Sequence, residues 1–173
     1  MSRFRPLGLT LLLAALGAAD PLPTHKEITG KIEKLQDRFW TNSKRLDALL
    51  GELRDIRAAF PSSDDPEGLL LRRQALRAQA GALFDEQWEL RQAHRKDLRG
   101  LYVFESTVFL RGVRRGVGPS APVAGTFFAY ENSVTEMKTN FGRFNEDLIK
   151  EDSEFRSLAR TYYDGKQFKR LSL

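Results

Sequence analysis

An unbroken seven-residue repeat of apolar side chains runs from Ile28 to Phe60. The repeated positions are separated alternately by four and three residues over more than four heptads, and Asn42 is the only polar residue among them. This spacing places the side chains along one face of an α-helix, and a stripe this long and regular is typical of a coiled-coil seam. The repeat therefore predicts a long helix over residues 24–60 whose apolar face must be covered by other helices.

Residue types at both ends of this stretch set its limits. Thr24, followed three residues later by Glu27, fits a capping box, in which both side chains bond free backbone N–H groups. Pro61 ends the helix, because the residue before a proline avoids helical geometry. Asp65 and Pro66 then fit the cap and first position of another helix. Because the connection is so short, we expect the two helices to be antiparallel neighbours.

A second helix is expected over residues 66–115, with a less regular seam. Leucines recur every seven residues, but most of the positions between them are polar. The leucines are Leu69, Leu76, Leu83 and Leu90, and the alternate positions are Arg73, Ala80, Gln87 and His94. Residues 101–113 are rich in β-branched and aromatic side chains, which favour a strand. We expect the helix to continue to about Arg115 instead, because a single strand would have nothing to pair with.

A third helix is expected over residues 121–164, after a cap at Ser120. Its seam again alternates between spacings of four and three, Glu151 interrupts it, and Gly165 is expected to end the helix. Together the three helices predict an all-α fold, an elongated antiparallel three-helix bundle of the coiled-coil type with long helices. A helical hairpin that dimerises would also cover the seams. The stricter seams indicate that the first and third helices supply the core, while the second faces a partner.

Residues 1–19 differ from the rest of the chain. Arg3 and Arg5 precede a uniformly apolar run over residues 7–16, and small residues follow it. This order is typical of a secretory signal peptide, whereas a mitochondrial presequence would be amphipathic. The run is too short to span a bilayer of about 30 Å. We expect an exported protein, in the periplasm or outside the cell, in which residues 1–19 are cleaved or retained as an anchor. Residues 20–173 then form a single helical domain without a membrane span.

Few residues are suited to catalysis or metal binding. The absence of cysteine excludes disulfides, thiol catalysis and thiolate metal sites. The two histidines, His25 and His94, lie in different expected helices, and neither has a second ligand at metal spacing. There is no serine in a nucleophile turn and no glycine loop for phosphate, and a slender rod seldom holds paired carboxylates in a pocket. We expect no catalytic residue, no metal and no cofactor.

Arginines beside aromatic residues or glycines are the candidates for binding. Guanidinium groups bind phosphate and carboxylate, and nearby glycines let backbone N–H groups approach an anion. The alternative for the glycine-rich segment is a solubilising turn. The net charge of +5 is modest, which argues against nucleic acid and leaves anionic envelope surfaces and acidic proteins. The candidates for partner or anion binding are Trp88, Arg91, Arg95, Arg111, Arg114 and Arg115.

Two polar residues occupy seam positions. Asn42 and Glu151 could each fix helix register or oligomeric state, as buried polar residues do in coiled coils. The alternative is that each lies where the bundle opens to solvent. For Glu151, which stands in an acidic cluster, we expect a solvated face near a helix end.

The regular seams and the absence of a recognisable chemical site favour a non-enzymatic protein. We expect an exported structural or assembly protein that acts through coiled-coil packing with a protein partner or with further copies of itself. The alternative is a periplasmic holding chaperone that binds clients through the basic, partly apolar flank of the second helix.

Overall fold

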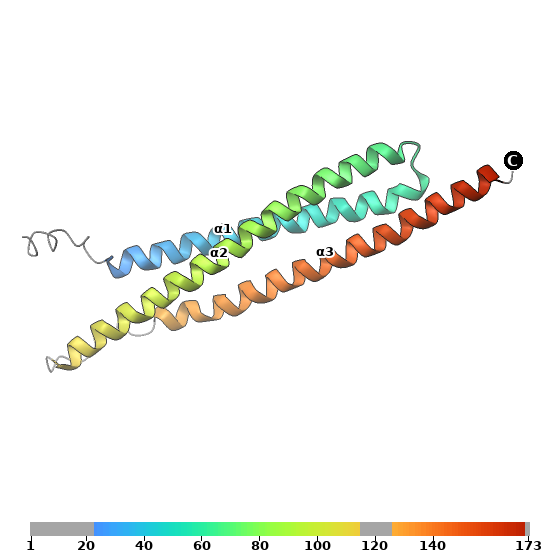
Figure 1. Ribbon diagram of the computed structural model, residues 1–173. Coiled ribbons are helices and arrows are strands. Elements are labelled where there is room, and N and C mark those ends of the chain that lie inside the picture. Colours follow the sequence, from blue (N-terminus) through green and yellow to red (C-terminus); the bar gives the residue numbers. More distant parts are fainter. Residues whose placement is uncertain (1–22, 115–125, 172–173) are drawn as a thin grey trace, which may run out of the picture.

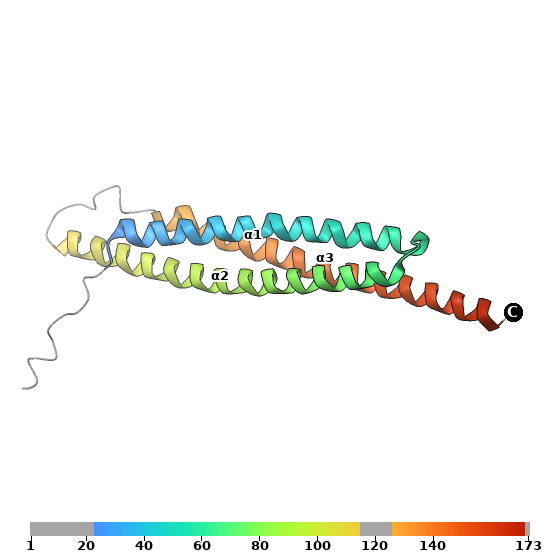
Figure 2. The same cartoon turned by 90° about the horizontal axis from the view of Figure 1, so that it is seen from above.

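The computed structural model is an elongated bundle of three long helices (Figure 1). The helices are α1 (His25–Ala59), α2 (Pro66–Arg114) and α3 (Thr126–Leu171), with a short 3-10 helix, η2 (Phe60–Ser62). The structure describes residues 23–114 and 126–171, with the backbone alone at 113, 114 and 166–171. Helix α2 runs antiparallel to α1 and α3, and the rod looks slender from two perpendicular directions (Figure 2). The predicted all-α antiparallel three-helix bundle is confirmed.

The capping signals at the starts of α1 and α2 act as expected. The Thr24 hydroxyl accepts a hydrogen bond from the backbone N–H of Glu27, and the Glu27 carboxylate accepts one from the backbone N–H of Thr24 (2.7 Å). At the start of α2, the Asp65 carboxylate accepts a hydrogen bond from the N–H of Gly68 (2.9 Å). A cap of this kind contributes about 1 kcal/mol to helix stability. The starts of α1 and α2 are therefore defined locally, before any packing.

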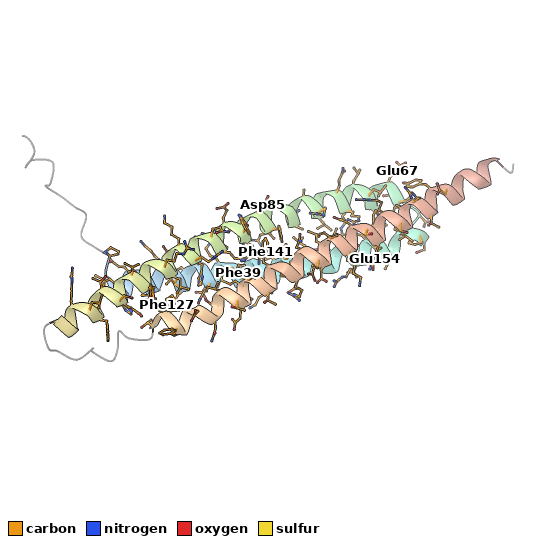
Figure 3. The ribbon with its side chains drawn as sticks, turned by 60° about the horizontal axis from the view of Figure 1, so that its bottom comes forward. Phe39, Glu67, Asp85, Phe127, Phe141 and Glu154 are labelled. Carbon is orange, nitrogen blue, oxygen red and sulfur yellow. The ribbon has the colours of Figure 1, made fainter. Side chains whose placement is uncertain are left out.

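The core runs the length of the rod in three groups of buried side chains contributed by all three helices. Around the connection between α1 and α2, Phe60 is fully buried and its ring meets those of Phe155 and Tyr162 edge-on. Phe39 and Met137 are buried in the middle group, and Ile32 and Leu101 in the third. Figure 3 shows Phe127, Phe39 and Phe141 in this order along the bundle.

Helix α2 supplies more buried side chains than α3 among the described residues, so the expectation that α1 and α3 supply the core while α2 faces a partner is wrong. α1 and α2 are the most extensively packed pair. The heptad positions of α2 that carry polar residues point inward all the same: Arg73, Gln87 and His94 are buried together with Ala80. The buried face of α2 therefore continues along the helix, with polar residues at several of its positions.

The limits of the helices differ in part from the expected ones. Residues 101–113 are helical, as expected, and the described residues contain no strand. Gly165 does not end α3, which continues to Leu171. A glycine inside a helix costs only about 1 kcal/mol relative to alanine, so it need not stop one. The expected start of the third helix at residue 121 and the cap at Ser120 lie outside the described residues.

The helices are offset along the rod, so that a different helix projects at each end (Figure 1). The last residues of α2 extend beyond the starts of α1 and α3, and the last residues of α3 extend beyond the connection between α1 and α2. None of the helices formed by the described residues is long and apolar enough to cross a membrane.

Candidate functional site

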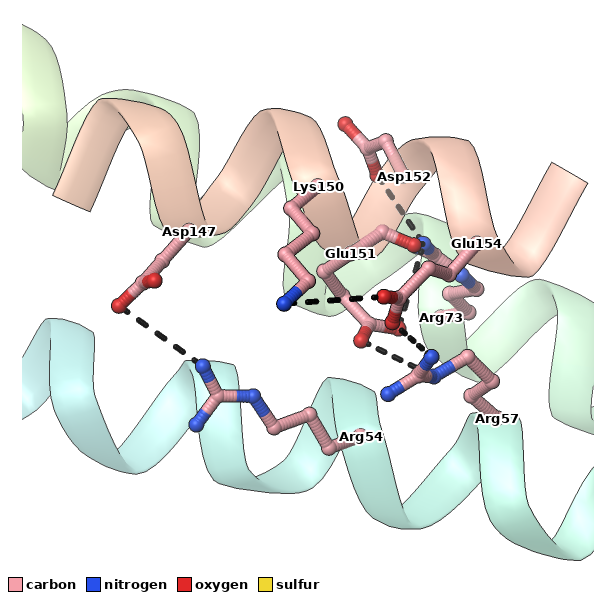
Figure 4. A network of polar contacts seen from close by, with 8 residues as sticks. All are labelled: Arg54, Arg57, Arg73, Asp147, Lys150, Glu151, Asp152 and Glu154. Carbon is pink, nitrogen blue, oxygen red and sulfur yellow. Dashed lines mark hydrogen bonds and ion pairs between the residues drawn. The ribbon is translucent and has the colours of Figure 1, made fainter. Parts of the chain in front are cut away.

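A buried ion pair links α2 to α3 near the connection end of the rod (Figure 4). Arg73 lies 3.7 Å from the Glu151 carboxylate and donates a hydrogen bond to the backbone carbonyl of the same residue. On the other side, Arg57 of α1 lies 3.1 Å from Glu151. One carboxylate of α3 is thus held by an arginine from each of the other helices.

Further charges surround this central group. Arg73 and Arg77 both bond the Asp152 carboxylate, at 3.0 and 2.7 Å. Arg57 also pairs with Glu154. Because a buried charge without a partner is costly, every member of such a cluster depends on the others. The arrangement can fix the positions and orientations of the three helices relative to one another.

Glu151 does not lie on the solvated face that we expected near a helix end. It is 2% exposed, because α3 continues for about five turns beyond it and arginines from α1 and α2 cover it. Burial raises the pKa of Glu151, against the lowering effect of Arg57 and Arg73. Its side chain is thus a buried polar group of the seam, and whether it sets the register stays a prediction.

Asn42, the other polar residue of a seam, is buried in α1. Its amide nitrogen has no hydrogen-bond partner of ordinary geometry among the described residues. The pKa of Glu86 is lowered, mainly by the hydrogen bond from Arg38. The Asn42 side chain lies close enough to Glu86 to add to this lowering. A register-setting role for Asn42 also stays a prediction.

A second polar group crosses the middle of the bundle. Gln87 of α2 donates a hydrogen bond to the hydroxyl of Ser43 in α1 (2.7 Å), and that hydroxyl lies 2.8 Å from the side-chain oxygen of Asn140 in α3. Gln87 is fully buried and Ser43 nearly so. All three helices are therefore joined through one serine hydroxyl.

His94 occupies the next inward position of α2, seven residues further on. Its Nε2 lies 3.1 Å from both the Gln36 amide nitrogen of α1 and the Ser133 hydroxyl of α3. The ring is 1% exposed, and burial lowers the pKa of His94. Within the described ranges no group of three or more histidine and acidic side chains could hold a metal ion.

The last polar group lies where α1 and α3 begin. His25 of α1 lies 3.2 Å from Glu105 of α2, and the other oxygen of Glu105 accepts a hydrogen bond from the backbone N–H of Phe127 in α3 (3.3 Å). We call the four groups centred on Arg73, Gln87, His94 and Glu105 the polar layers. Each joins all three helices, and together they span about 48 Å of α2 at 1.5 Å per residue.

The candidate binding residues fall in two separate places. Trp88 is 46% exposed, and the guanidinium of Arg91 lies over both its ring (5.6 Å) and that of Phe141 in α3 (4.8 Å). Exposed Arg95 follows one turn later. The guanidinium of Arg91 already makes intramolecular cation–π contacts, which stabilise the fold. Trp88 and Arg95 remain on the surface.

Arg111 is exposed at the projecting end of α2, roughly 30 Å along the helix from Arg91. The structure therefore does not combine all the predicted arginines in one site. The side chain of Arg114 and the whole of Arg115 lie outside the described residues. Nothing in the arrangement of the described residues joins the two groups.

Two features were missed from the sequence. One is the set of polar layers. The heptad spacing of Arg73, Ala80, Gln87 and His94 could have indicated that these side chains point inward. The other is a cluster of exposed apolar side chains at the projecting end of α2 and the start of α3, whose signal was the aromatic stretch at 101–113. We call this cluster the tip surface; it consists of Tyr102, Val103, Phe109, Leu110 and Phe128.

Comparisons of the chain with protein-family models, with curated proteins and with solved structures found no match.

Proposed function

We propose that the chain is an exported, non-enzymatic structural or assembly protein that holds partners at a fixed separation. The observation that carries this proposal is the set of four polar layers, each of which ties all three helices together at one level of the rod. Such layers penalise sliding of one helix along another, because sliding would leave buried polar groups without partners. A rod held in this way has ends at a defined distance.

The surfaces available for partners support the same proposal. The ends of α2 and α3 project at opposite ends of the rod (Figure 1). The flank with Trp88 and Arg95 lies between them. Tryptophan and arginine are common among residues that dominate the energy of protein interfaces.

The test is to capture neighbours in the native envelope. A photo-reactive amino acid is placed at exposed Leu71, Trp88 or Phe109, in separate variants of the full chain. We expect discrete cross-linked products that differ between positions near the two ends. No product at any position, or a compact particle in small-angle scattering, would rule the proposal out.

Export has its own measurement. We expect the protein recovered from its native source to begin at Asp20 or to retain residues 1–19, and in either case to be found outside the cytoplasm. N-terminal sequencing of the fractionated material tests both points. Recovery from the cytoplasm alone would contradict export.

A holding chaperone is the second candidate, favoured by exposed Trp88 next to exposed Arg95 on the surface of α2. It would slow aggregation of an unfolded client at near-stoichiometric ratio, and the double variant Trp88→Ala/Arg95→Ala would do so less well. No effect of the unaltered chain on aggregation removes this candidate.

A further inference from the structure

The end of α2 projects alone from the bundle. Glu105 marks the level at which both neighbours begin, because it contacts His25 at the start of α1 and Phe127 at the start of α3. The residues of α2 beyond this level, 106–114, therefore extend roughly 13 Å past the other two helices. Both ribbon views show this projection (Figures 1 and 2).

The tip surface lies on this projecting end and on the adjoining turns of α2 and α3. Phe109 and Leu110 are 45% and 57% exposed on its last described turns. Tyr102 and Val103 lie two turns earlier, and Phe128 belongs to the first turn of α3. Elsewhere the exposed large apolar side chains of the described residues are scattered, as at Leu71 and Ile149. A concentrated apolar patch on a helix end marks a contact surface.

Basic side chains accompany the apolar ones. Arg111 is exposed next to Leu110, and Arg95, Lys96 and Arg99 are exposed on the preceding turns of α2. Of the carboxylates nearby, Glu105 is buried against His25, and half-buried Asp97 lines the same pocket as Arg111. Exposed Glu131 is the nearest acidic residue of α3 in sequence, one turn after Phe128. Apolar and aromatic side chains next to cations match the interfacial region of an anionic lipid bilayer.

The path of the chain points to the same end. Pro23 stands two residues before the start of α1, and α1 begins at the level of Glu105. Pro23 lines a pocket together with Val103, Phe104 and Arg111 of α2. The described chain therefore enters the rod beside the tip surface.

We propose that the tip surface docks peripherally on a lipid bilayer that contains anionic headgroups, with the rod projecting away from it. Phe109, Leu110 and Phe128 enter the boundary between headgroups and acyl chains, and Arg111 pairs with lipid phosphates. This inference deepens the proposed function by naming a partner for one end of the rod. It does not depend on the other end having a partner.

A lipid surface fits this end better than a second copy of the chain does. A stable protein interface buries roughly 1,200–2,000 Å² in total. The single projecting helix end, about 13 Å long, presents only a small part of that area to a protein. A membrane needs no matching groove and can surround a helix that is apolar on several sides.

Vesicle co-sedimentation tests the proposal. The full chain and a chain that starts at Asp20 are each mixed with vesicles of phosphatidylcholine alone or with added phosphatidylglycerol. The shorter chain keeps every buried core residue that the structure describes, because the first of these is Ile28. We expect both chains to bind the anionic vesicles. The variant Phe109→Glu/Leu110→Glu should lower binding of the chain starting at Asp20 by about tenfold or more.

A matched control carries the same change elsewhere. Leu71→Glu/Ile149→Glu alters two exposed apolar residues away from the tip and adds the same negative charge, and it should bind like the unaltered chain. Circular dichroism checks that every variant keeps its helices. Arg111→Gln should reduce the preference for phosphatidylglycerol while leaving the apolar contact in place.

Several outcomes overturn the proposal. Unchanged binding by the tip variant removes the tip surface from the interaction, and equal binding to both vesicle types removes the anionic headgroup. Binding that disappears in the chain starting at Asp20 places the affinity in residues 1–19 alone. A dimer in sedimentation that the tip variant dissociates, without vesicle binding, shows that a second copy occupies the tip. None of these outcomes affects cross-linking to protein partners at Leu71. The lipid proposal can therefore fail while the proposed function holds.

Discussion

Arg73 of α2 and Glu151 of α3 face each other inside the bundle, 3.7 Å apart and both nearly inaccessible to solvent. A charged pair at this depth loses the hydration that both groups have in the unfolded chain. What it adds is a strong penalty for any packing that separates the two residues. The pair is therefore better explained as a determinant of how the helices align than as a source of stability.

Replacing one member of the pair should be costly, and replacing both much less so. Arg73→Met leaves the Glu151 carboxylate buried with Arg57 as its remaining partner, and we expect a loss of about 3 kcal/mol in the free energy of unfolding. Arg73→Met/Glu151→Leu removes both charges and should recover more than half of that loss. Urea unfolding followed by circular dichroism measures both values.

The neighbouring arginine is the control for this pair. Arg72 pairs with Glu52 at 3.1 Å, but both side chains are exposed. Arg72→Met should change stability by less than about 0.5 kcal/mol, because exposed ion pairs contribute little. Equal effects at positions 72 and 73 would contradict the burial argument.

The middle polar layer depends on one hydroxyl. Ser43→Ala removes the main acceptor of Gln87, which keeps only a long hydrogen bond to the Phe39 carbonyl (3.4 Å), and it removes the group that faces half-buried Asn140. We expect a loss of about 2 kcal/mol. Thr41→Ala, at an exposed position of the same helix, should change stability by less than about 0.5 kcal/mol. A neutral Ser43→Ala variant would show that this layer is not needed.

Stability should fall with acidification through His94. Because burial lowers the pKa of His94 in the folded chain, the unfolded chain binds the proton at higher pH. Neutral His94 therefore contributes its full stability above about pH 6.5. This stability decreases as the pH falls below that value, and the decrease ends below the pKa of His94 in the folded chain. His94→Gln cannot titrate, so the advantage of the unaltered chain over it should shrink between about pH 7.5 and about pH 5. A constant difference across that range would contradict the prediction.

The aromatic cluster at the connection should be among the most sensitive parts of the core. Phe60 is fully buried and contacts the rings of Phe155, Tyr162 and Tyr163. Phe60→Ala should cost about 3 kcal/mol or more, since it leaves a cavity lined by those rings. Leu71→Ala, at a position that is 70% exposed, should be nearly neutral. Denaturant midpoints of the two variants provide the comparison.

Much of the candidate site was predictable, but its geometry was not. The sequence identified Glu151 and Asn42 as polar residues in a seam, and it identified Trp88 and Arg91 as candidate binding residues of one helix. It could not show that Glu151 is buried, because that depends on Arg57 and Arg73, which lie far from it in sequence. The weaker seam of α2 suggested an outward face, although its polar residues are buried.

The sequence by itself determined the helices and the direction in which they run. Heptad spacing, the capping box at Thr24 and the short connection ending at Pro66 are local features, and each restricts the backbone through contacts within a few residues. Only the tertiary structure decided how far each helix is shifted along the rod. That shift follows from the sum of many long-range contacts, including the four polar layers. It leaves the end of α2, with Phe109 and Leu110, uncovered by the other two helices.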